Sequence, residues 1–284
     1  MVRIKVPATS ANLGAGFDCM GLALDIYNEL IVEPCEKLVI ETDDDLPKDL
    51  NNLVASTMKK TYEHLGHEFK GAYLKQINNI PKTSGLGSSA ACIVAGVTAA
   101  NALLGNPLTQ EDVVDLCTAF DGHPDNVVPA IMGGITVSVI NGAGKVHTFR
   151  CLPEKNLKVA LLIADFELST TKARAVLPDM YSRADLVYSL SRAVATFAAL
   201  STGDFEKLRY ILDDKIHTPY RRHLIKDFDE ITQQFKNSNA LGVFLSGAGP
   251  TIAAFVDNSF VPFTPPAHWR LEVRDIIDKG VVLD

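Results

Sequence analysis

The chain lacks both a long apolar run and a cluster of basic side chains. No stretch approaches the roughly 20 consecutive apolar residues that a membrane helix needs. Lysines and arginines number 27 against 34 aspartates and glutamates, so the formal net charge is −7. Proteins that bind nucleic acids carry basic patches. We therefore expect neither a membrane span nor a nucleic-acid partner.

Cysteine is also scarce and badly placed for cross-linking or zinc. The five cysteines are an odd count, lie far apart and form no Cys-x-x-Cys pair. This argues against a disulfide framework and against a zinc site. The first ten residues, MVRIKVPATS, predict a strand and a turn rather than a signal peptide, which favours a cytoplasmic location.

What the chain does have is enough apolar residues for a substantial core, 47% of 284. This length favours two domains, and a weak seam at 141–153 divides them into 1–150 and 151–284. Alternating polarity predicts strands at 2–6, 22–33, 38–42, 69–77, 135–140, 157–164, 241–245 and 251–256. Helical spacing predicts helices at 52–65, 88–104, 109–120, 172–177, 185–200 and 205–212.

Residues 81–91, Pro-Lys-Thr-Ser-Gly-Leu-Gly-Ser-Ser-Ala-Ala, join a glycine turn to the start of a helix. Glycines without Cβ let backbone N–H groups approach an anion, and the paired serines supply an N-cap and hydroxyls for phosphate oxygens or Mg²⁺. The segment lacks both the Walker ending and the dinucleotide fingerprint. It predicts a nucleotide-phosphate loop; the alternative is an ordinary glycine turn that caps a helix.

Two other loops place short polar side chains beside turns. Residues 10–18, Ser-Ala-Asn-Leu-Gly-Ala-Gly-Phe-Asp, follow a strand, and the alternative to a binding loop is an Asx-rich turn. Residues 121–126, Asp-Gly-His-Pro-Asp-Asn, predict a turn-rich loop after a helix. A lone histidine in such a loop is often a structural hydrogen-bonding residue rather than a catalyst.

Arg174 and Arg221 each follow a turn or open a helix, in the segments STTKAR and HTPYR. An isolated arginine is normally a solvated surface residue, which is the alternative for both. Residues 246–250, SGAGP, predict a tight turn between two strands.

These six segments, in this order, resemble the signature motifs of the GHMP kinases, the superfamily of galactose, homoserine, mevalonate and phosphomevalonate kinases. PKTSGLGSSAA looks like the ATP loop, while PATSANLGAGFD, STTKAR and HTPYR are most similar to the homoserine kinase branch. The resemblance implies an α+β fold with an N-terminal β-α-β domain that carries the ATP loop and a C-terminal ferredoxin-like domain. It also implies ATP-dependent phosphorylation of the L-homoserine hydroxyl, for threonine biosynthesis.

The resemblance further implies a role for each matched residue. ATP would be bound by the loop residues Pro81, Lys82, Thr83, Ser84, Gly85, Leu86, Gly87, Ser88, Ser89, Ala90 and Ala91. Homoserine would be bound by Asn12, Asp18, His123, Asn126, Thr170, Arg174, Arg221 and Gly247. Mg²⁺ would be held by Ser88 and Asp121, where Asp121 replaces the usual glutamate. Asp125 matches a catalytic aspartate of mevalonate-type relatives, so Asp121, Asp125 and Ser88 are the catalytic candidates.

One segment departs from the resembled family, which normally has a helix between 256 and 269. Residues 257–266 contain Pro262, Pro265 and Pro266, so no stable helix fits there. Either a loop replaces the helix or the chain lacks residues at this point. Two other functions stay open: a kinase for another small alcohol, such as mevalonate or a sugar, and a GHMP-fold sensor without turnover. The assembly considered is a homodimer.

Overall fold

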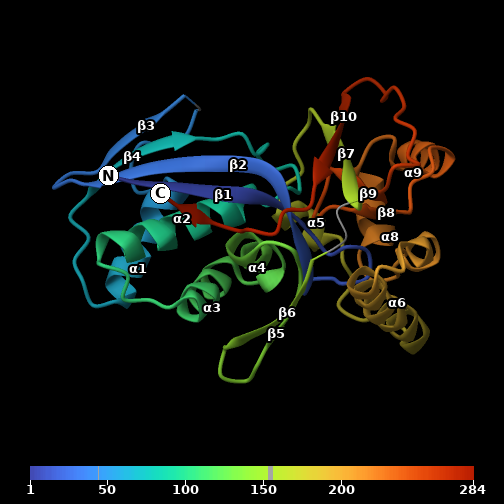
Figure 1. Cartoon of the computed structure of the whole chain (residues 1–284), viewed down its shortest axis with the longest axis horizontal. Coiled ribbons are helices and arrows are strands. Elements are labelled where there is room, and N and C mark those ends of the chain that lie inside the picture. Colours follow the sequence, from blue (N-terminus) through green and yellow to red (C-terminus); the bar gives the residue numbers. More distant parts are fainter. Residues whose placement is uncertain (44, 153–155) are drawn as a thin grey trace.

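Two β-sheets organise the two halves of the chain (Figure 1). The computed structural model describes residues 1–43, 45–152 and 156–284. In these residues one sheet has seven strands and the other has four. No helix of the described residues is long and apolar enough to cross a membrane.

The larger sheet runs in the order β11-β1-β2-β4-β3, with β5 paired to β2 and β6 paired to β5. Its strands are β1 (Val2–Ala11), β2 (Met20–Pro34), β3 (Val39–Thr42), β4 (Ala72–Ile77), β5 (Ile135–Ile140), β6 (Val146–Cys151) and β11 (Val282–Leu283). Strand β2 has 15 residues, so it pairs with β5 through its first residues and with β4 through its last ones. This arrangement places the C-terminal end of β1 and the first residues of β2 near the centre of the molecule (Figure 1).

Four helices pack against one face of the larger sheet (Figure 1). They are α1 (Leu53–His64), α2 (Ser88–Leu103), α3 (Gln110–Asp121) and α4 (Pro124–Met132). Most of α2 is buried, because its small and apolar residues let α1, α3 and β1 pack closely around it. A Cβ on Gly96 would lie 2.7 Å from the Thr57 side chain, so α1 and α2 approach each other only through a glycine.

The smaller sheet is antiparallel and runs in the order β10-β7-β9-β8. Its strands are β7 (Lys158–Ala164), β8 (Gly242–Leu245), β9 (Ile252–Val256) and β10 (Trp269–Asp275). Counted along the second half of the chain, this order is 4-1-3-2, which is the ferredoxin-like arrangement. The predicted two-domain α+β fold is confirmed.

Helices of the second half lie between β7 and β8 in sequence. They are α5 (Thr170–Ala175), α6 (Arg183–Thr202), α7 (Leu208–Ile211), α8 (Thr218–Arg221) and α9 (Phe228–Asn237), with 3₁₀ turns at Phe205–Lys207 and Arg222–Leu224. Residues 257–268 form no helix, as the prolines predict. Phe260 and Phe263 of this loop pack on Phe235 of α9, so a loop covers the place where the resembled family has a helix.

The predicted seam at 141–153 needs correction. Residues 146–151 form β6, which pairs with β5 along its whole length; Pro153 lies outside the described residues. The chain also returns to the larger sheet after β10, because β11 pairs with β1 and Gly134 donates to the Ile277 carbonyl. Thus residues 276–284 pack with the first half of the chain. The division at residue 150 stays a proposal.

Several elements were missed because local signals were weak or contradictory. Helix α4 contains Pro124 and Pro129, but a proline at the first helical position is favourable, so the predicted loop 121–126 shrinks to Gly122 and His123. Strand β6 lies in a surface hairpin, where exposed and half-buried residues alternate, and it has few apolar residues to reveal the strand in the sequence. Helix α8 has only four residues. Helix α9 was also missed, although it has a clear apolar face on which Ile231 and Phe235 are buried, a periodicity that indicates a helix.

Candidate active site

The phosphate loop has a backbone that requires its two glycines. Gly85 and Gly87 have φ of +83° and +70°, in the left-handed region. A Cβ on Gly85 would lie 2.3 Å from the Ser246 carbonyl oxygen, and one on Gly87 would lie 1.9 Å from Thr9 Oγ1. Both positions therefore exclude a side chain, because the loop packs directly on β1 and on the 246–250 turn.

Two of the three serines of this loop, Ser88 and Ser89, keep their hydroxyls free, whereas Ser84 Oγ donates to the Pro81 carbonyl at 2.8 Å. Gly87 occupies the N-cap position of α2 without a side-chain cap, so the prediction that a serine caps this helix is wrong. In the described part of the chain, neither the Ser88 nor the Ser89 hydroxyl has a hydrogen-bond partner. The first N–H groups of α2 also lack intrahelical acceptors. An anion at this end meets N–H groups, two hydroxyls and the positive end of a 16-residue helix.

A cavity of about 360 Å³ lies over this helix start. Of the predicted ATP-loop residues, those that line it are Thr83, Ser84, Gly85, Gly87, Ser88, Ser89 and Ala90. Leu86 and Ala91 are instead buried in the core. Pro81 and Lys82 line a neighbouring hollow with residues 165–167. The loop thus divides into residues that face the cavity and residues that anchor it.

The 246–250 turn ties the first motif to the phosphate loop. Ser246 Oγ lies 2.6 Å from the Gly85 carbonyl, to which it donates, and 2.7 Å from Ser10 Oγ. The Gly247 N–H donates to the Ala11 carbonyl at 3.1 Å. The Gly247 carbonyl accepts from Asn12 Nδ2 at 2.9 Å and from Arg221 Nη1 at 3.2 Å. Both backbone polar groups of Gly247 are therefore engaged within the protein.

Asp121 and Asp125 bring a half-buried and a buried carboxyl to the same cavity. Asp121 ends α3, and Asp125 lies in the first turn of α4 with 5% of its surface exposed. Burial, with the nearby Asp18 and Asp121 charges, raises the pKa of Asp125 to about 7. Burial also raises the pKa of Asp121 to about 6, against the opposing effect of Arg174. Asp125 therefore exchanges its proton close to neutral pH, as a general base does.

Asp125 is held by two contacts that the sequence did not reveal. A Cβ on Gly21 would lie 1.8 Å from the Asp125 carbonyl oxygen, so only glycine lets β2 approach α4 at this point. In a regular helix the Asp125 carbonyl accepts from the N–H of residue 129, but that residue is Pro129, which has no N–H. Asn126 donates to Asp125 Oδ1 at 3.3 Å and accepts from Thr9 Oγ1 at 2.8 Å. Asn126 thus orients the acid.

Asp18 and Arg174 form a charge pair at the other end of the cavity. Arg174, in α5, donates to Asp18 through both terminal nitrogens, at 3.0 and 2.7 Å, although the two residues are 156 positions apart in the chain. His123 Nε2 lies 3.5 Å from Asp18 Oδ2, and burial lowers the His123 pKa. Two residues predicted to bind opposite charges of one substrate therefore bind each other in this structure.

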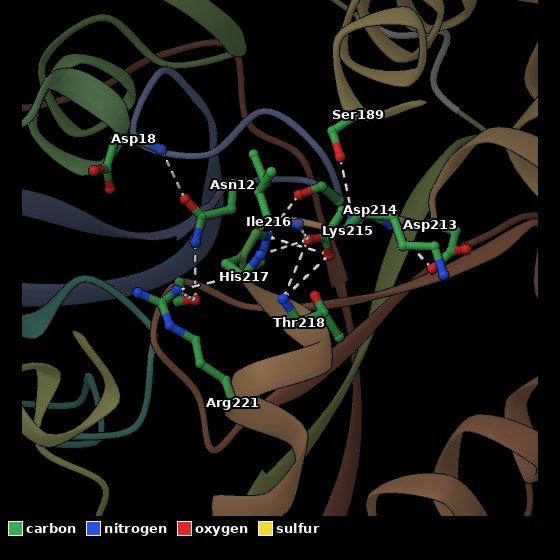
Figure 2. A network of polar contacts seen from close by, with 12 residues as sticks. Asn12, Asp18, Ser189, Asp213, Asp214, Lys215, Ile216, His217, Thr218 and Arg221 are labelled. Atoms are coloured by element: carbon green, nitrogen blue, oxygen red, sulfur yellow. Dashed lines mark hydrogen bonds and ion pairs between the residues drawn. The ribbon is translucent and has the colours of Figure 1, made fainter. Parts of the chain in front are cut away.

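Asn12 shapes the loop that presents Asp18. Its side chain is 2% exposed, and its Oδ1 accepts from the Asp18 N–H at 3.0 Å (Figure 2). Its amide nitrogen is engaged by the Gly247 carbonyl. Thr170, at the start of α5, lines the cavity near Arg174, as predicted, while Leu168 and Ala248 line it without having been predicted.

Arg221 is the most deeply buried charge of the site. It is 1% exposed, and it donates to the carbonyls of Ala173 and Gly247, at 3.1 and 3.2 Å, and its Nη1 lies 3.5 Å from His217 Nδ1. Among residues 1–43, 45–152 and 156–284, no carboxylate lies within ion-pair distance of it. Burial, followed by the Arg174 charge, lowers the Arg221 pKa. A guanidinium in this environment favours an anionic partner.

Phe17 forms a platform beneath both arginines, a role that the sequence did not suggest. The guanidinium carbons of Arg174 and Arg221 lie 5.5 and 5.1 Å from its ring centre. The ring also stacks on His217 at 5.2 Å. A cation over an aromatic face is stabilised electrostatically. Phe17 therefore keeps two like charges close together at one end of the cavity.

No side-chain cluster of the described residues forms a metal site by itself. No group of three or more histidine, cysteine, aspartate or glutamate side chains there has suitable geometry. The five cysteines are all free thiols. Asp121 nevertheless lines the cavity together with the free Ser88 hydroxyl. One carboxylate and one hydroxyl fit Mg²⁺ only when substrate phosphates and water complete its ligands.

Comparisons with known proteins agree with this geometry. Residues 52–134 match the family model of the GHMP kinases N terminal domain, and residues 196–260 match that of the GHMP kinases C terminal domain. A homoserine kinase of Caldicellulosiruptor bescii is 43% identical and aligns over 98% of this chain and 91% of its own. One from Clostridium botulinum is 44% identical, over 100% of this chain and 99% of its own.

A solved structure extends the likeness to three dimensions. The crystal structure of homoserine kinase from Cytophaga hutchinsonii superposes with a TM-score of 0.85 at 26% identity, covering 100% of this chain and 97% of that one. Identity above 40% over nearly the whole length, both domain matches and this shared fold agree with one another. The chain belongs to the homoserine kinase family of the GHMP kinases.

Proposed function

We propose that this protein transfers the γ-phosphoryl group of ATP to the side-chain hydroxyl of L-homoserine, giving O-phospho-L-homoserine for threonine biosynthesis. The observation that carries the proposal is one cavity with two different ends. One end has a free helix start and free hydroxyls, which suit phosphate. The other end has Asp18, Arg174 and Arg221, which suit a zwitterion. Membership of the homoserine kinase family supports the same assignment.

ATP binding is supported by the phosphate loop. The N–H groups at the start of α2 and the hydroxyls of Ser88 and Ser89 are free to bind phosphate oxygens. Phosphoryl transfer requires mainly positioning and neutralisation of charge. The rigid loop provides both, because the packing at Gly85 and Gly87 leaves its backbone little freedom to move.

Asp125 is proposed as the group that takes the proton of the homoserine hydroxyl. Its carboxylate accepts the proton as the hydroxyl oxygen forms its bond to phosphorus and the bond from phosphorus to the ADP oxygen breaks. A pKa of about 7 means that roughly half of Asp125 is ionised and ready at neutral pH. Asn126 keeps its carboxyl oriented during this step.

Mg²⁺ is the metal that we propose for the site, with Ser88 and Asp121 as the residues that would hold it. The donor set fits, since oxygen atoms are the ligands that Mg²⁺ prefers, and the Asp121 carboxyl and the Ser88 hydroxyl line the same cavity. When bound, Mg²⁺ neutralises charge on the transferring phosphate. The Asp121 side chain is one methylene shorter than glutamate, so a water molecule between Asp121 and the metal is part of this proposal.

Homoserine recognition is proposed to replace the internal ion pair. The substrate ammonium would bind Asp18, and its carboxylate would bind Arg174 and Arg221, whose guanidinium groups suit a planar carboxylate. Thr170 and His123 lie beside these groups. In the structure, Asn12, Asn126 and Gly247 use their polar groups within the protein, so we propose that they shape the pocket as well as contact the amino acid.

Two alternatives differ from this proposal in a way that an assay separates. A neutral sugar has no carboxylate and mevalonate has no amine, so neither matches both charges of the pocket. A sensor without turnover would not need a buried acid with a pKa near 7 opposite a phosphate loop. The structure therefore favours catalysis on a zwitterion.

The test is ADP release measured with ATP, Mg²⁺ and each of four compounds: homoserine, threonine, mevalonate and galactose. We expect kcat/KM for homoserine to be at least about 100-fold above that for the other compounds, because the site recognises both a carboxylate and an ammonium group. Two further probes divide the substrate: 3-amino-1-propanol lacks the carboxylate, and 4-hydroxybutanoate lacks the ammonium. Turnover of mevalonate or galactose above that of homoserine would overturn the proposal.

The remaining expectations concern partners and location. A nucleic-acid or membrane partner is not part of the proposed activity. The cytoplasmic location and a possible homodimer stay predictions, the latter measured by light scattering after size-exclusion chromatography.

A further inference from the structure

The turn before α8 is held by side chains in place of backbone carbonyls (Figure 2). The N–H groups of residues 216, 217 and 218 all donate to Asp214 Oδ1, at 2.8, 2.7 and 3.2 Å. The Lys215 N–H donates to Ser189 Oγ of α6 at 3.0 Å. Asp214 is 1% exposed and does not line the cavity over the phosphate loop. A carboxylate that accepts three N–H groups fixes the turn that leads into Arg221.

His217 links this turn to the substrate cavity. It is fully buried, and its Nε2 lies 2.7 Å from the Gly14 carbonyl oxygen, in the loop that presents Asp18. Burial lowers the His217 pKa, so the ring is neutral at physiological pH. The carbonyl can only accept, which assigns the proton to Nε2 and leaves Nδ1 as an acceptor. That Nδ1 lies 3.5 Å from Arg221 Nη1.

Arg221 depends on this scaffold for its position and for its charge balance. Its own backbone N–H donates to the His217 carbonyl at 3.1 Å, so the turn sets the direction of its side chain. The other acceptors of its guanidinium are carbonyl oxygens, which carry only partial charges. The half-buried Asp18 and the buried Asp214 carboxylates lie beyond ion-pair distance of it and favour its charged form.

We propose that Asp214 is a positioning residue for carboxylate recognition. It holds the 214–218 turn and the adjacent His217, and through them it sets the Arg221 guanidinium at the amino-acid end of the cavity. Asp214 does not touch the substrate in this proposal. The inference rests on the proposed function, because Arg221 is taken there as a group that reads the substrate carboxylate.

The experiment removes the charge of Asp214 with the least change of shape. Asp214→Asn keeps an oxygen that accepts N–H groups but removes the negative charge, and Asp214→Ala removes both. Asp213→Asn is the matched control, because Asp213 is the exposed neighbour and its Oδ2 accepts from the Tyr188 hydroxyl. Its Oδ1 accepts from the Asp214 N–H at 2.9 Å, and the asparagine keeps an oxygen for that bond. The measurements are kcat and KM for homoserine, for 3-amino-1-propanol and for ATP, on the full chain, with unfolding temperature as a check.

We expect Asp214→Asn to raise the homoserine KM by about tenfold, because a small displacement of a positioning group costs up to 100-fold. The kcat/KM for 3-amino-1-propanol and the KM for ATP should stay within about twofold of the wild type, since neither involves a carboxylate at Arg221. Asp214→Ala should raise the homoserine KM further, again with little change for 3-amino-1-propanol and ATP. Asp213→Asn should match the wild type on every substrate.

The outcomes separate this inference from the proposed function. A wild-type protein that does not phosphorylate homoserine overturns the proposed function. An active wild type whose Asp214→Asn variant keeps the wild-type ratio of homoserine to 3-amino-1-propanol overturns the positioning role alone, whether both activities fall or neither does. If the Asp214 variants do not fold, His217→Gln replaces them: it keeps a donor for the Gly14 carbonyl and removes the ring beside Arg221. An unchanged ratio in that variant also overturns the role.

Discussion

The two ends of the cavity differ in whether their polar groups already have partners within the protein. At the phosphate end, the Ser88 and Ser89 hydroxyls and the first N–H groups of α2 have no partner in the described residues. At the amino-acid end, Asp18 and Arg174 already bind each other. One end is an open anion site formed by a single segment. The other is a closed pair of charges brought together from distant segments.

The difference gives each end its own kind of selectivity. An open site of N–H groups accepts any suitable anion and depends on its rigid backbone for affinity. A closed ion pair must be replaced, and a zwitterion replaces both partners without leaving a charge unpaired. A molecule with only one charge leaves Asp18 or Arg174 without compensation, which is costly in a partly buried site. The amino-acid end therefore selects by charge pattern.

The largest expected effect is at the open end, from Gly87→Ala. The added Cβ would lie 1.9 Å from Thr9 Oγ1 and 3.2 Å from Asn126 Oδ1, so the loop must move. We expect kcat/KM for ATP to fall by about 100-fold to 1,000-fold, as when a main transition-state donor is lost. Gly105→Ala is the control, since Gly105 also has a positive φ of +84° but no atom within 4 Å of its Cβ. Equal losses in both variants would show that the packing at Gly87 is not important.

The next effect tests the acid between the two ends. Asp125→Asn should lower kcat by about 100-fold or more, because the amide cannot take the hydroxyl proton. A base acts in its ionised form, so wild-type kcat/KM should rise with pH and level off above about 7, the pKa of Asp125. Steady-state rates from pH 5.5 to 8.5 measure this limb. A variant that keeps both the rate and the limb would exclude Asp125 as the base.

A smaller effect comes from the closed end, through its two arginines. Arg221→Ala should raise the homoserine KM roughly 30-fold, which corresponds to about 2 kcal/mol for a lost charge partner. Arg174→Ala should weaken homoserine binding as well, but it frees Asp18, so 3-amino-1-propanol should bind at least as well as to the wild type. Calorimetric titration with both compounds measures this difference. Equal weakening of both compounds by Arg174→Ala would mean that Asp18 is not the ammonium site.

The smallest effect is on stability. The pKa of Asp125 is about 7 in the folded protein against about 3.8 when unfolded, so its stabilising contribution is complete below about pH 4 and is lost as pH rises through 7. Asp125→Asn should therefore raise the unfolding temperature at pH 8 by a few degrees, with little gain at pH 4. Thermal unfolding of both proteins across this range measures the difference. A variant less stable than the wild type at pH 8 would show that the ionised carboxylate of Asp125 does not destabilise the folded protein.

Motifs that depend on local geometry were readable in the sequence. The glycine turn before α2 and the loop that replaces a helix at 257–266 follow from glycine and proline chemistry within a few residues. The absence of a helix at 257–266 was confirmed. The serine N-cap was wrong, because packing against β1 puts Gly87 at that position.

The sequence by itself determined the family and the fold class, through the resemblance of its motifs to those of the GHMP kinases. It also determined the glycine turn before α2, because turn chemistry acts over short distances. Only the tertiary structure decided the Asp18–Arg174 pair, the platform of Phe17 and the part that Asp214 has in holding Arg221. It also decided the pKa of Asp125, which no spacing predicts. The physical reason is that charge pairing and desolvation depend on distance and burial in space, and residues 156 positions apart meet only once the chain has folded.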